Sequence, residues 1–112
     1  MDTSRLMKLV GTAIEAGVCD PRLLDRLTDT SSVEAGTVST EDLVHIYRRR
    51  LKRTPTGSQL HSETKALVDF LEQHQHDSLV MMSVSLAGGG GELFLLDRDG
   101  EKILHWMRMF SR

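Results

Sequence analysis

The sequence predicts an α+β fold, with four amino-terminal helices packed on a carboxy-terminal three-stranded antiparallel β-meander in a single domain, residues 1–112. Apolar residues recur with the helical period in four segments before about residue 75, and three later apolar runs have the length of strands. A strong hairpin signal, Asp97-Arg98-Asp99-Gly100, separates the last two runs. The 112 residues, 39% of them hydrophobic, suit one soluble core.

The first two helices are expected at about 4–16 and 21–28. Asp20-Pro21 predicts the start of the second, because a capping side chain precedes a proline at the first helical position. Residues 28–39 are small and polar and have no sustained hydrophobic period. We therefore expect a loop there.

Serine caps predict the third and fourth helices, at about 40–53 and 58–75. Ser39 and Asp42 resemble a capping box, and Ser58 follows a turn that contains proline and glycine. Both helices carry an apolar stripe that would face a core.

The strands, expected at about 79–87, 92–97 and 101–110, are apolar on both faces. If Asp97 faces Glu101 across the hairpin, then Leu95 faces Ile103 and Glu92 faces Trp106. One face then holds Leu93, Leu95, Ile103, His105 and Met107, and the other holds Phe94, Leu96, Leu104 and Trp106.

An apolar second face favours a protein partner, in a homodimer or a heteromer, because large exposed apolar patches are uncommon on isolated chains. Trp and Arg are enriched where binding energy concentrates. The candidate partner-binding residues are therefore Phe94, Leu96, Leu104, Trp106 and Arg108. The alternative is that the four helices cover both faces of the sheet and leave no patch.

The charge and the single cysteine restrict the partners and the compartment. A formal net charge of -2 gives no general attraction to phosphate or anionic lipid. Cys19 alone excludes an internal disulfide and favours the reducing cytoplasm. No apolar stretch has the length of a signal or a membrane span, so we expect no membrane partner.

The motifs that suggest chemistry have simpler interpretations. Gly88-Gly89-Gly90-Gly91 precedes a strand, whereas a phosphate loop precedes a helix. Asp97–Glu101 lacks the ligand spacing of a calcium loop. The five histidines do not have zinc-ligand spacing, although the sequence leaves open whether any of them, or Cys19, is functional. We expect no cofactor, no metal and no catalytic residue.

One basic cluster, Arg48, Arg49, Arg50, Lys52 and Arg53, ends the third helix. It suits the helix dipole, and it could bind nucleic acid or an acidic protein. The loop before this helix is too long for a helix-turn-helix, and the chain has few aromatic residues for base stacking.

The sequence therefore favours a small non-enzymatic cytosolic protein-binding module of the inhibitor, immunity, antitoxin or adaptor type, acting by stoichiometric binding. A nucleic-acid-binding regulator that uses residues 48–53 is the first alternative. The second is a small enzyme whose site is assembled only in space.

Overall fold

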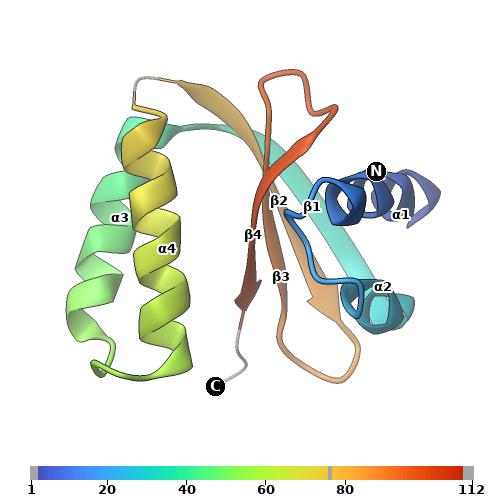
Figure 1. Cartoon of the computed structure of the whole chain (residues 1–112), viewed down its shortest axis with the longest axis horizontal. Helices are drawn as coiled ribbons and strands as arrows, with labels where there is room; N and C mark the ends of the chain where they lie inside the picture. Colours follow the sequence, from blue (N-terminus) through green and yellow to red (C-terminus); the bar gives the residue numbers. More distant parts are fainter. Residues whose placement is uncertain (1–2, 76, 110–112) are drawn as a thin grey trace.

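The computed structural model describes residues 3–75 and 77–109, which form three layers with a sheet in the middle (Figure 1). Helix α1 (Thr3–Glu15) and the short helix α2 (Leu23–Arg26) lie on one side of the sheet, and α3 (Thr40–Arg53) and α4 (Gln59–Gln73) lie on the other. The strands β1 (Thr30–Ser39), β2 (Ser78–Leu86), β3 (Gly91–Leu96) and β4 (Ile103–Met109) are antiparallel, in the order β1-β2-β3-β4. The α+β class is confirmed.

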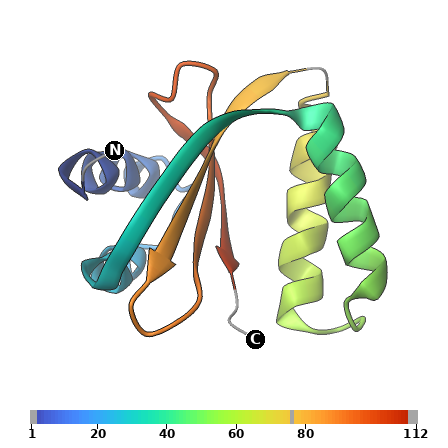
Figure 2. The ribbon, with the colours of Figure 1, turned by 180° about the vertical axis from the view of Figure 1, so that it is seen from behind.

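The predicted loop at 28–39 is wrong, because Thr30–Ser39 form β1 and the two residues before it belong to a 3-10 turn. This strand pairs with β2 from Thr30 opposite Leu86 to Ser39 opposite Ser78, and it runs along the front of the sheet in Figure 2. Most of its side chains are exposed on both faces, so the sequence has no alternating apolar pattern to reveal a strand. The sheet therefore has four strands, and two of the four helices follow its first strand.

The helix expected at 21–28 is shorter than predicted. Asp20 accepts a hydrogen bond from the backbone N–H of Arg22 at 2.8 Å, but α2 begins only at Leu23, after a turn, and Arg22 occupies the N-cap position without a side-chain cap. After Arg26 the chain tightens into a 3-10 turn, Leu27–Asp29, and then enters β1. The caps of the next helices are confirmed, since Ser39 accepts from the N–H of Asp42 and Ser58 accepts from the N–H of His61.

The predicted hairpin register is also wrong, although Gly100 takes the expected left-handed conformation with φ of 68°. The N–H of Asp97 bonds the carbonyl of Lys102, not of Glu101, and Leu96 faces Ile103. Leu104 is then an extra residue, because Leu95 faces His105 and Phe94 faces Trp106. This bulge moves Ile103 to the face of Phe94 and Leu104 to the opposite face.

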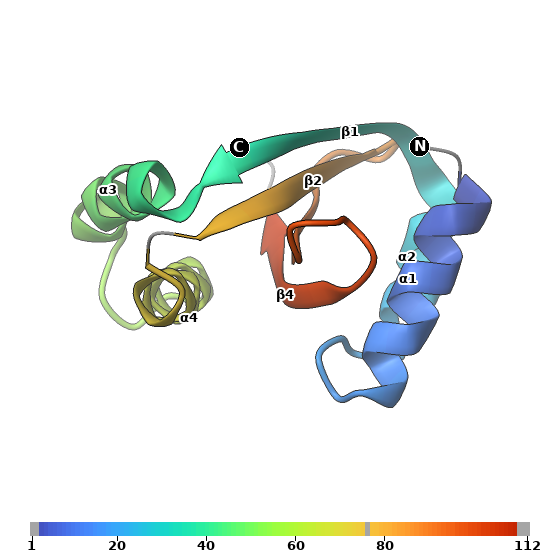
Figure 3. The same cartoon turned by 90° about the horizontal axis from the view of Figure 1, so that it is seen from above.

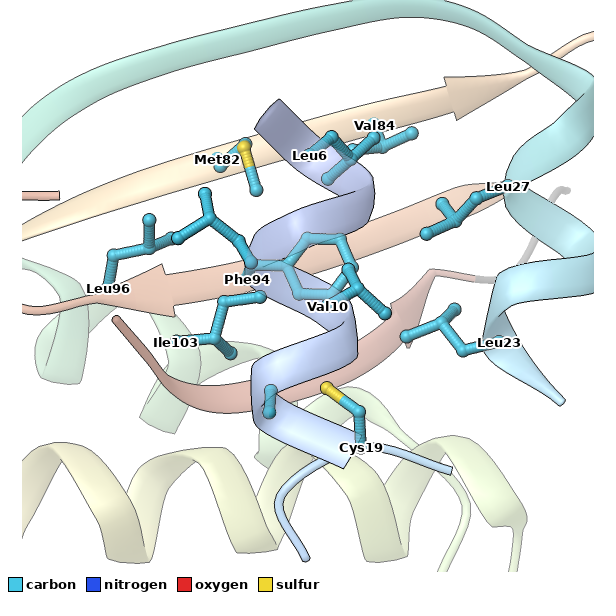
Figure 4. Packing of buried hydrophobic residues seen from close by; sticks show 12 residues of the cluster. Leu6, Val10, Cys19, Leu23, Leu27, Met82, Val84, Phe94, Leu96 and Ile103 are labelled. Atoms are coloured by element: carbon cyan, nitrogen blue, oxygen red, sulfur yellow. The ribbon is translucent and has the colours of Figure 1, made fainter. Parts of the chain in front are cut away.

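Helices cover both faces of β2, β3 and β4, and the described residues form two hydrophobic clusters. One cluster joins α1 and α2 to Met82, Val84 and Phe94 (Figure 4). The other joins α3 and α4 to the opposite face of β2, β3 and β4, where Leu93 and Leu95 are buried. No helix within residues 3–75 and 77–109 is long and apolar enough to cross a bilayer.

Candidate functional site

The candidate partner-binding residues on the sheet do not form an exposed patch. Phe94 and Leu96 have no accessible surface because α1 and α2 pack over them (Figure 4). Leu104 is half-buried and contacts the opposite cluster. Trp106 is half-buried beside α2, and only Arg108 is exposed. The chain's own helices therefore cover most of the surface that the sequence predicted for a partner.

A buried ionic cluster lies where β3, β4 and α2 meet. The Glu92 side chain is 0% exposed, and it accepts a bond at 2.9 Å from Nε of Arg26 and another at 3.0 Å from the indole N–H of Trp106. The Arg26 guanidinium also lies 5.6 Å from the centre of the Trp106 ring. Both carboxylate oxygens are therefore occupied, which is the condition for keeping a charge inside a protein.

Sequence reasoning missed this cluster, although a signal was present. Glu92 is the only charged residue in the apolar run of β3, and a lone acid in such a strand needs a buried partner. Burial and then the Glu92 charge raise the pKa of the nearby Cys19 thiol to about 11, so Cys19 is protonated at neutral pH. A buried, protonated thiol at Cys19 suits a structural role better than a nucleophilic one.

The histidines that the structure describes do not gather at a common site. Thr54 shares a hydrogen bond with His61, His74 lies 3.5 Å from a carboxylate oxygen of Asp77, and His105 stacks on Phe70. His76 lies outside the described residues. Elsewhere in the described chain, no group of three or more His, Cys, Asp or Glu is placed to hold a metal ion, and no buried side-chain nitrogen or oxygen lacks a partner.

The structure divides the basic cluster at the end of α3. Arg48 is paired with Glu72 of α4 at 3.0 Å, whereas Lys52 is exposed. The remaining three arginines line a shallow hollow of about 140 Å³ together with an isoleucine. We call it the α3 hollow; its residues are Ile46, Arg49, Arg50 and Arg53.

The two edges of the sheet differ in how they are protected. Strand β4 is covered at one point by α4, because the carboxylate of Glu63 accepts a hydrogen bond from the backbone N–H of Arg108. Partial burial raises the pKa of Glu63, which the bond from Arg108 partly offsets. Strand β1 forms the opposite edge, and no described element lies beyond it in Figure 3.

The register identifies the backbone groups on the β1 edge. The N–H of Leu86 bonds the carbonyl of Gly90, so even-numbered residues of β2 direct their backbone groups toward β3. The β1 residues opposite these even-numbered positions must therefore direct their own N–H and C=O groups away from the sheet. They are Val33, Ala35 and Thr37.

This edge lacks the usual devices that prevent pairing with another chain. It is ten residues long, longer than the common strand of about five or six, and it contains neither proline nor lysine. Its one charged residue is Glu34. The one irregularity, a bulge near Ser31, lies at the beginning of the strand and leaves residues 32–39 regularly paired with β2.

Comparison of the chain with protein-family models, with curated proteins and with solved structures finds no match.

Proposed function

We propose that this chain is a non-enzymatic protein-binding module that accepts an extended segment of a partner beside β1, as a fifth strand. The open edge of β1 is the observation that carries the proposal. The module would act by stoichiometric occupancy, as an inhibitor, an immunity or antitoxin-type protein, or an adaptor does.

The backbone of β1 supplies the affinity in this mode of binding. Val33, Ala35 and Thr37 offer N–H and C=O groups to a strand laid beside them, as in other cases of strand addition. Side chains would add specificity, since Ala35 and Thr37 are exposed on one face and Glu34 on the other. A partner strand could therefore contact the backbone edge of β1 and the side chains on both of its faces.

A second copy of the chain is one such partner. Two β1 strands can pair antiparallel about a two-fold axis through Ala35, and Glu34 of each copy then faces Gly36 of the other. The two Glu34 carboxylates are then diagonal neighbours and do not face each other directly, so like-charge repulsion is weaker than it would be for a facing pair. A different protein with a free extended segment satisfies the same backbone groups.

The test removes one outward N–H and leaves the chain's own sheet intact. Ala35→Pro and Thr37→Pro each delete a donor that β2 does not use, and proline is tolerated at edge positions. Ala35→Thr is the matched control because it changes the side chain and keeps the N–H. Circular dichroism establishes that each variant is folded before binding is measured.

Tagged wild type and variants are purified from the native cell, and the bound proteins are identified and quantified by mass spectrometry. The purified chains are also sedimented to give their solution mass. We expect wild type and Ala35→Thr to hold one partner at a constant stoichiometry, or to form a dimer, and both proline variants to lose it. A complex that survives in the folded proline variants contradicts strand addition, as does a wild-type monomer that captures nothing.

A further inference from the structure

A second surface, the α3 hollow, combines positive charge with an apolar side chain. Its residues lie at spacings of three, four and seven along α3, which places them on one side of the helix. Leu43, Val44 and Tyr47 lie on a separate side of α3 and pack into the core, whereas the hollow residues are exposed. The hollow therefore faces outward, where a partner can reach it.

In the part of the chain that the structure describes, no carboxylate neutralises the three arginines of the hollow. Within residues 3–75 and 77–109, no carboxylate forms an ion pair with Arg49, Arg50 or Arg53, whereas Arg48, one position earlier, is paired with Glu72. The guanidinium of Arg50 lies 4.9 Å from the centre of the Tyr47 ring, a cation–π contact that does not neutralise its positive charge. Three planar donor groups are thus concentrated around one small depression.

Ile46 gives the hollow its apolar part. It is 40% exposed, and it is one of two large hydrophobic residues with that degree of exposure in the described chain. Mixed apolar and cationic chemistry suits a peptide whose carboxylates alternate with aliphatic side chains. The volume of about 140 Å³ has room for one or two such side chains.

We propose that the α3 hollow binds an acidic segment of a protein partner, with carboxylates held by the three arginines and an aliphatic side chain on Ile46. The site uses no residue of β1, so it stands independently of strand addition. Arginine suits this role because its planar fork matches a carboxylate in a bidentate pair.

A nucleic acid is less well matched to this surface. The positive charge covers one end of α3, and the neighbouring α4 does not extend it into a track for phosphates, because Glu72 and Asp69 there pair with Arg48 and Lys65. Tyr47 is buried and covered by Arg50, so it offers no ring for base stacking. A short acidic segment needs neither a long cationic track nor a stacking platform.

Fluorescence anisotropy tests the proposal with a labelled peptide of alternating Glu and Leu, a second peptide of alternating Glu and Gly, and a labelled single-stranded DNA. The test variant is Arg49→Ala with Arg50→Ala and Arg53→Ala. The control variant removes three exposed positive charges elsewhere, Lys8→Ala with Arg98→Ala and Lys102→Ala, and so reproduces the change in net charge.

We expect the arginine variant to bind the Glu-Leu peptide at least about tenfold more weakly than wild type, and the control variant to stay within about twofold. Ile46→Ser should weaken binding of the Glu-Leu peptide several-fold and leave the Glu-Gly peptide unchanged. Equal losses in the two triple variants would reduce the effect to net charge and overturn the proposal. So would tighter binding of the DNA than of the peptide, or no binding of the peptide to wild type.

Discussion

Arg26→Ala should destabilise the chain strongly, because it leaves the buried Glu92 carboxylate with one neutral donor. Glu92 is fully buried, and its two oxygens now receive bonds from Arg26 at 2.9 Å and from Trp106 at 3.0 Å. Removing one partner of a buried ion pair costs about 3–5 kcal/mol. Arg26 is 26% exposed, so water can reach part of the vacated space, and we expect the lower end, about 3 kcal/mol.

This loss is large beside the total stability of about 5–15 kcal/mol typical of such a domain. With a denaturant slope of about 1.5 kcal/mol/M, the urea midpoint should fall by about 2 M. Far-UV circular dichroism is the primary signal, since Trp106, the only tryptophan, belongs to the cluster. Its fluorescence then reports whether the cluster opens together with the rest of the chain.

A double-mutant cycle with Glu92→Gln decides whether the buried charge is the cause. In the wild type, Glu92→Gln should cost about 1–3 kcal/mol, because it weakens the bond to Arg26. In the Arg26→Ala background the same change should restore about 1–2 kcal/mol, because it removes an uncompensated charge. Arg98→Ala, on the exposed hairpin, should stay within about 0.5 kcal/mol of wild type. If Glu92→Gln destabilises both backgrounds equally, the reasoning is refuted.

Three further predictions concern other buried groups. Gly91→Ala should cost about 3 kcal/mol in urea unfolding, since its Cβ would collide with the carbonyl oxygen of Val84; a loss below 0.5 kcal/mol would contradict this close approach. Cys19, whose pKa is raised to about 11, should react with a thiol reagent at pH 8 far more slowly in the folded chain than in urea, and equal rates would contradict its burial. Burial lowers the pKa of His105 below its ordinary 6.5, so the unfolded chain takes up the proton first as pH falls. Stability should therefore decrease from pH 6.5 down to the folded-state pKa, and urea midpoints of His105→Phe should lack that part of the slope; identical slopes would show that His105 does not contribute.

The sequence by itself determined the local features whose causes lie within a few residues. Ser39 and Ser58 cap their helices as predicted, because a cap depends on one side chain and the next turn of backbone. The left-handed Gly100 was equally local. The apolar character of both sheet faces also followed from the sequence, and it agrees with a sheet covered by helices on each side.

Only the tertiary structure decided which elements meet. Strand β1 forms because β2 supplies hydrogen-bond partners for its backbone. Its side chains are mostly exposed on both faces, so its sequence carries no hydrophobic period that would predict a strand. The bulge at Leu104 likewise shifted the register by an amount that no turn motif specified.

The positions of the candidate surfaces depended on the same long-range contacts. Glu92 is paired with Arg26, which lies 66 residues away in the sequence, and α1 packs over Phe94. The sequence alone could therefore predict neither the ion pair nor the burial. The basic cluster was visible in the sequence, but only the helix packing separated Arg48, held by Glu72, from the arginines of the α3 hollow. The open edge of β1 is decided in the same way, because an edge exists only once the order of the strands is set.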